Sequence, residues 1–176
     1  MVKGIFISPI NGLYTFKIDK MQKLRLPFII FCFITTIVNG QNCTSFQEAK
    51  EQGITMEKLD STYTNAIHSD STVYAIFRGQ EDEFYNAYIE VLKELASYLK
   101  KNEYLWEKPT WCFHKIYFSK EGKIDYWLYN FRKGEITETK LKEFKILLNE
   151  FQKYFKFGLP AKDKFSQCGS ATYKDN

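Results

Sequence analysis

The chain has 176 residues and a formal net charge of +4, from 25 lysines and arginines against 21 aspartates and glutamates. The positive excess lies in residues 1–40, which hold five basic residues and one acid, whereas residues 41–176 hold 20 of each sign. A neutral main body with interspersed charges lacks the basic surface of nucleic-acid-binding proteins, so the composition argues against a nucleic-acid partner.

Residues 21–40 have the pattern of a cleavable signal peptide. A short basic head at Lys23 and Arg25 precedes the uncharged apolar run 26–38, and a small residue, Gly40, stands just before the expected cleavage point. The run is too short to span a bilayer, which takes about 20 residues. We therefore predict a secreted or periplasmic protein with no stable membrane span after cleavage, the alternatives being a membrane anchor or a buried core helix.

Residues 1–20 precede this segment, although a signal peptide normally begins at the N-terminus of the precursor. Met21 stands two residues before the basic head, so we predict that translation starts there and that residues 1–20 reflect a mis-set start; a genuine strand-like extension is the alternative. Residues 41–176 have a common size for one domain, and we predict a single αβ globular domain.

The first predicted elements of this domain are a short helix and a long one. Ser45-Phe46-Gln47-Glu48 has the form of a capping box and predicts a helix over 45–52, ended by Gly53. For residues 54–79 the sequence does not decide between helical turns and extended structure. Apolar residues recur every three or four positions over 81–101, and acids at the start and lysines at the end suit the helix dipole.

A β-hairpin follows, with aromatic and β-branched strands at 111–118 and 124–131 around a turn at 119–123. A five-residue loop predicts that Phe118 lies opposite Ile124, Ile116 opposite Tyr126 and His114 opposite Leu128. That register puts these residues on the core face. On the other face it gathers an aromatic group: Phe113, Tyr117, Trp127, Tyr129 and Phe131.

A second amphipathic helix begins at a cap on Thr137 or Thr139 and ends at Gly158-Leu159-Pro160, and residues 164–174 predict a third strand. The order is α-β-β-α-β. We therefore predict an α+β fold in which two helices pack on one face of a three-stranded antiparallel sheet.

Three segments together resemble the C-terminal domain of the TonB family: KIYFSKEGKIDYWLYNF (115–131), EFKILLNEFQKYFKFGLP (143–160) and FSQCGSATYK (165–174). The chain also resembles a group of small secreted bacterial proteins that share the IYF…GKIDYWLYNF and KFSQC segments. TonB-type energy transducers carry a membrane anchor and a long Pro-rich spacer, whereas this chain has four prolines in all. The resemblance implies strand edges that pair with partner segments, without energy transduction.

Three cysteines remain after cleavage, and an oxidising compartment favours one disulfide among them. All three pairings are open, and we favour Cys43–Cys168 because it would join the two ends of the domain. A zinc site is not expected, since no two cysteines have ligand-pair spacing and the chain has only two histidines. We predict no metal and no cofactor.

The aromatic group is the candidate binding surface: either residues 54–79 fold across and cover it, or it docks a protein segment or a sugar chain. Cys112 and His114 point to the same face of a strand and form the one candidate catalytic pair, although no orienting group or oxyanion hole is recognisable. We therefore predict a non-enzymatic exported domain that binds a protein partner. A small enzyme using Cys112 and His114, or a carbohydrate-binding module, is the alternative.

Overall fold

The computed structural model of the protein describes residues 42–175. The predicted signal peptide at 21–40 and the predicted mis-set start or extension at 1–20 lie outside the described residues. Among the described residues, none of the helices has the length and apolar character needed to cross a membrane.

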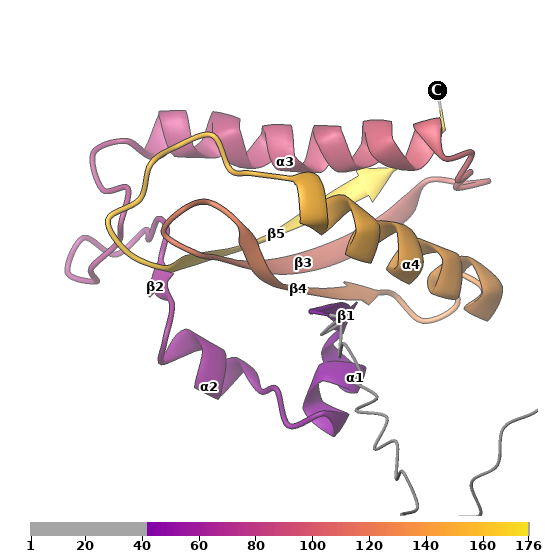
Figure 1. Ribbon diagram of the computed structural model, residues 1–176, viewed down its shortest axis with the longest axis horizontal. Coiled ribbons are helices and arrows are strands. Elements are labelled where there is room, and N and C mark those ends of the chain that lie inside the picture. The colour runs from indigo at the N-terminus through magenta and orange to yellow at the C-terminus, as the bar shows by residue number, and fades with distance from the viewer. Residues whose placement is uncertain (1–41, 176) are drawn as a thin grey trace, which may run out of the picture. The chain divides into compact units, whose positions relative to one another are not determined.

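A five-stranded mixed sheet with the order β1-β4-β3-β5-β2 forms the centre of the fold (Figure 1). Its three middle strands, β4 (Ile124–Phe131), β3 (Thr110–Phe118) and β5 (Phe165–Tyr173), are antiparallel neighbours. Two short strands lie at the edges: β1 (Cys43–Ser45) runs parallel to β4, and β2 (Thr64–Asn65) runs parallel to β5. The predicted three-stranded antiparallel sheet is therefore wrong, because it lacks both short parallel strands.

The predicted fold with only two helices packed on the sheet is also wrong, because the described residues form four helices, the predicted one at 45–52 among them, and they lie on both sides of the sheet. The long helices α3 (Glu81–Lys101) and α4 (Glu138–Tyr154) cover one face, as predicted from their apolar stripes. The short helices α1 (Phe46–Glu51) and α2 (Met56–Asp60) lie on the opposite side (Figure 1). The sheet is thus the middle layer of three rather than the outer layer of two.

Local sequence signals account for the helix ends. The Ser45 side chain accepts the Glu48 N–H while Glu48 reaches back to the Ser45 N–H, which is the predicted capping box. The Thr137 side chain accepts the Lys140 N–H at 3.3 Å and begins α4. Each cap satisfies backbone donors that the first turn of a helix leaves without partners.

A β-bulge in the hairpin decides which side chains face the long helices. Phe118 lies opposite Ile124 as predicted, but the next step along β3 places Tyr117 opposite Tyr126, so Asp125 is an extra residue in β4. Beyond the bulge the predicted register is wrong by one residue: Ile116 lies opposite Trp127. A shift of one residue moves every following side chain to the other face of the sheet.

The larger core fills the space between the sheet and α3 and α4. It is rich in aromatic rings, and rings of both layers touch: Phe84 of α3 lies 6.2 Å from Phe165 of β5, and Phe144 of α4 lies 5.1 Å from Tyr129 of β4, between ring centroids. Buried aromatic rings each remove a large apolar area from water, so this layer supplies most of the hydrophobic stabilisation.

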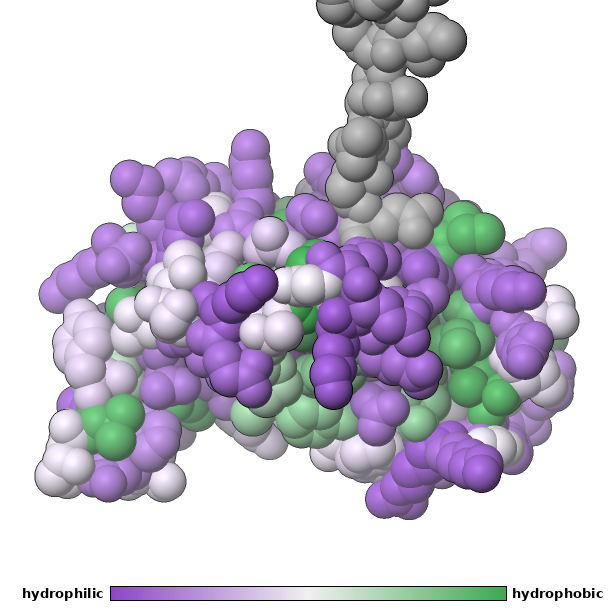
Figure 2. Space-filling model, turned by 90° about the horizontal axis from the view of Figure 1, so that it is seen from below, coloured by the Kyte–Doolittle hydropathy of each residue, from purple (hydrophilic) through white to green (hydrophobic). Residues whose placement is uncertain are grey.

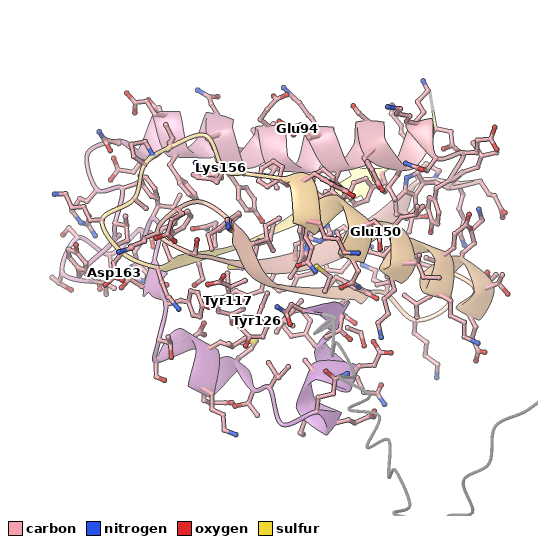
Figure 3. The ribbon with its side chains drawn as sticks, viewed as in Figure 1. Glu94, Tyr117, Tyr126, Glu150, Lys156 and Asp163 are labelled. Atoms are coloured by element: carbon pink, nitrogen blue, oxygen red, sulfur yellow. The ribbon has the colours of Figure 1, made fainter. Side chains whose placement is uncertain are left out.

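A smaller core holds α1 and α2 to the other face of the sheet. Tyr117 and Tyr126 point from the sheet toward these helices (Figure 3), and Tyr63 packs edge-on against Tyr117 with ring centroids 5.1 Å apart. The two buried hydroxyls are satisfied, because Tyr117 donates to Asp60 at 3.0 Å and Tyr63 donates to Asp125 at 2.8 Å. These bonds fix the segment that the sequence left unassigned.

Candidate functional site

The five aromatic residues of the predicted binding surface do not share a face. Phe113 and Tyr117 point toward the α1 and α2 side, whereas the bulge turns Trp127, Tyr129 and Phe131 toward α3 and α4. Trp127 and Tyr129 are buried there, and Tyr117 is buried under Tyr63. Seen from the α1 and α2 side, hydrophobic surface shows only in separate areas between polar side chains (Figure 2). The five residues therefore do not form one aromatic surface.

The predicted disulfide between Cys43 and Cys168 is not formed. Cys43, Cys112 and Cys168 are all free thiols. Cys43 lies in β1 beside Trp127 and faces the long helices, whereas Cys168 lies in β5 beside Lys115 and points to the opposite side. A disulfide needs Cα atoms about 4.4–6.8 Å apart and Cβ atoms that converge, and two strands separate these cysteines.

Cys112 and His114 do come together, but inside the core. The Cys112 sulfur lies 3.9 Å from His114 Nδ1, which accepts the indole N–H of Trp127 at 2.9 Å. The imidazole proton therefore sits on Nε2, 3.0 Å from the Tyr173 hydroxyl. Burial lowers the pKa of His114 to about 3 and raises the pKa of the Cys112 thiol far above its usual range. A neutral, inaccessible pair of this kind links β3 to β4 and β5 and offers solvent no thiolate.

The outer edge of β5 is the most distinctive exposed feature. Ala66 N–H donates to the Ser166 carbonyl at 2.9 Å, and Thr64 N–H donates to the Lys164 carbonyl at 3.1 Å. Even-numbered residues of β5 therefore direct their backbone groups away from β3. β2 pairs only with Phe165 and Ser166, and no other described segment forms a strand beside the rest of β5.

We call the outward backbone groups of Cys168, Ser170 and Thr172 the β5 edge. Proteins usually protect such an edge with charged residues, prolines or bulges. β5 has none of these between Lys164 and Lys174: its sequence, FSQCGSATY, is uncharged, and its pairing with β3 is regular throughout. One outward group is occupied locally, because Gln167 Nε2 donates to the Cys168 carbonyl at 3.1 Å.

An apolar stripe on α3 flanks this edge. One side of α3 faces α4, as the 5.6 Å contact between Tyr98 and Phe151 shows, and the core side lies over β5, with Tyr88 against Gly169. The side away from α4 carries the α3 stripe, which follows helical spacing and consists of Tyr85, Ile89, Leu92 and Ala96. Tyr85 is 58% exposed and the other three are half-buried. A strand added to β5 would cover this stripe.

A hollow of about 440 Å³ lies where the stripe and β5 end. Its walls include Ala96 and Lys100 of α3, Thr172 and Tyr173 of β5, and Trp106. The Trp106 and Tyr173 rings stack at 4.7 Å. The Asp175 carboxylate accepts the backbone N–H groups of Trp106 and Glu107 at 3.0–3.1 Å, which fixes this end of the edge.

Sequence reasoning found the strand at 164–174 but not its role. Its lack of charge was a readable signal, since an uncharged strand is either central or an unprotected edge. Only the pairing of β3 with both β4 and β5 shows that β5 lies next to the margin of the sheet.

Comparison with protein-family models, with curated proteins and with solved structures finds no match to this chain. The resemblance to the TonB C-terminal domain therefore stays a prediction.

Proposed function

We propose that this protein is an exported, non-enzymatic binding domain that pairs an extended protein segment with the β5 edge. The observation that carries the proposal is the length of unpaired strand beyond Ser166. Backbone groups at such an edge hydrogen-bond to any extended segment, and pockets beside it select the side chains. The signal-peptide pattern of residues 21–40 supports export, and the strand pairing implied by the TonB resemblance agrees with the binding mode.

The shape of the site supports a peptide rather than a small molecule. Gly169 and Ala171 make a low floor on the helix side of β5, the α3 stripe makes a wall, and the hollow at Trp106 closes one end. Side chains of an added strand alternate between the two faces. Every second residue of the bound segment would therefore pack against the α3 stripe.

The burial of Cys112 and His114 supports a non-enzymatic role. Both side chains have no exposed surface, and the His114 ring nitrogens are engaged by Trp127 and Tyr173. Acyl-transfer chemistry would need this pair to meet a substrate carbonyl within about 3 Å, and the core leaves no room for one.

Peptide selection tests the proposal. A random-peptide display library selected on the wild-type protein should yield extended binders, and binding should slow hydrogen exchange at the Ser170 and Thr172 amides. Ser170→Pro removes one outward donor without breaking a bond to β3, so it should abolish binding. Ser170→Val keeps the N–H and should retain it. Binders that are indifferent to Ser170→Pro, or that protect amides elsewhere, would contradict strand pairing at β5.

A further inference from the structure

The geometry points to a second copy of this chain as the segment that pairs with the β5 edge, an inference that rests on the proposed function. The segment that no described strand pairs with runs from Cys168 to Lys174, since β2 occupies the edge through Ser166; within it the Cys168 carbonyl accepts a bond from the Gln167 side chain, which the second copy would replace. Antiparallel pairing of this segment with itself has its two-fold axis at Ala171. Ser170 then lies opposite Thr172 of the second copy, and the outward backbone groups of both strands meet.

The same two-fold axis brings the helices together. α3 runs in the direction of β5: Phe84 contacts Phe165 near the start of both, and Ala96 and Lys100 line the hollow with Tyr173 near their ends. An axis perpendicular to the sheet at Ala171 therefore sets the two α3 helices side by side and antiparallel. The α3 stripe of each copy would face that of the other and become buried, continuing the helical layer across the joined sheets.

Charge along α3 is complementary to this arrangement. The first turn carries Glu81, Asp82 and Glu83, and the last turn carries Lys100 and Lys101. In an antiparallel pair the acidic start of one helix meets the basic end of the other, and the helix dipoles oppose. Neither Asp82 nor Lys100 forms an ion pair within residues 42–175, so both are available for the contact.

A charge-swap cycle tests the inference, with association measured by analytical ultracentrifugation of the whole protein over a concentration series. The wild type should form a dimer. Asp82→Lys and Lys100→Glu should each weaken it about tenfold, because each reversal places like charges together twice across the axis. The double variant should restore wild-type association. Glu94→Lys, on the α4 side of α3, makes the same charge change as Asp82→Lys and should leave the dimer intact.

The outcomes separate this inference from the proposed function. A wild-type protein that stays monomeric, or a dimer that is indifferent to the single reversals or not restored by the double variant, would overturn self-pairing. Thermal melts of each variant show whether a loss of association reflects a loss of folding. If the protein is monomeric but selected peptides still protect the Ser170 and Thr172 amides, the binding function stands and only the identity of the partner is wrong.

Discussion

The two margins of the sheet, outside β1 and outside β5, differ in whether the outward backbone groups of the strand have hydrogen-bond partners. At the β1 margin, the Asn149 side chain of α4 takes the place of a neighbouring strand: its Oδ1 accepts the Cys43 N–H at 3.3 Å, and its Nδ2 donates to the Cys43 carbonyl at 2.8 Å. Lys145 of α4 also reaches Glu48 of α1 at 3.0 Å, joining helices from both sides of the sheet around this margin. At the β5 margin, residues 42–175 supply one such bond beyond Ser166, from Gln167 Nε2 to the Cys168 carbonyl at 3.1 Å, and no strand pairs with the outward groups of Ser170 and Thr172.

This difference shows that the fold does not require a strand with unpaired outward groups. A single amide on a helix is enough to satisfy a strand's outward groups, and α3 passes over β5 much as α4 passes near β1. On its side toward the β5 margin, however, α3 carries apolar residues where α4 carries Asn149. A margin left uncharged and flanked by apolar side chains is suited to pairing with another segment.

Removing the Asn149 amide from the β1 margin, which we call the closed margin, should have the largest effect on stability. Asn149→Leu leaves the buried N–H and carbonyl of Cys43 without partners, and we expect a loss of about 3 kcal/mol in the free energy of unfolding. Urea denaturation measures it. Ile146→Ala, at a side chain on α4 that is 63% exposed, is the control and should change little. Equal stability of Asn149→Leu and wild type would show that the amide does not close this margin.

Adding a side chain at the β5 margin, which we call the open margin, should lower the stability less. A Cβ atom at Gly169 would lie 3.1 Å from a Tyr88 ring carbon and 3.2 Å from its hydroxyl, so Gly169→Ala requires the Tyr88 side chain to shift by a few tenths of an ångström. We expect a loss of about 1 kcal/mol, the overpacking being partly offset by a less flexible unfolded chain. Ser170→Ala, whose side chain points away from α3, should be neutral in the same thermal melts. A stabilised Gly169→Ala variant would mean that the Tyr88 side chain makes room for the added methyl group without cost.

The stability that the closed margin contributes should also depend on pH, through the Glu48 carboxylate. Burial alone would raise the pKa of Glu48, but hydrogen bonds from Thr44, Lys145 and the Ser45 N–H, together with the Lys145 charge, lower it from 4.5 to about 2. Because the folded pKa is the lower one, the stabilisation is complete above pH 4.5 and is lost as pH falls toward 2.

Glu48→Gln should remove this dependence. We expect it to cost about 1 kcal/mol at pH 7, a value reduced by solvent screening because the Glu48 side chain is 42% exposed, and to lie closer to the wild type at pH 3. Denaturation at a series of pH values measures both. Glu51→Gln, an exposed acid of the same helix, should follow the wild-type profile. If Glu48→Gln and wild type lose stability in parallel below pH 4.5, this carboxylate does not hold the margin.

The sequence by itself determined the elements whose signals are local. The bounds of α3 follow from its apolar spacing and its charged ends, and the hairpin from two aromatic strands around a turn. The start of α4 is at Thr137, one of the two predicted caps, whereas the helix ends at Tyr154, before the predicted stop at Gly158. The terminal strand was predicted in the same way. Such signals depend on neighbours within a few residues, which is why they can be read from one sequence.

Only the tertiary structure decided the margins and faces of the sheet. β1 and β2 are three and two residues long, too short for a periodic signal, and β1 depends on Asn149, 106 positions away in the chain. The bulge at Asp125, whose carboxylate accepts the Tyr63 hydroxyl from 62 positions away, turns Trp127 and Tyr129 into the core. Strand pairing is non-local, so which strand is left with an open edge is settled only when the whole sheet has assembled.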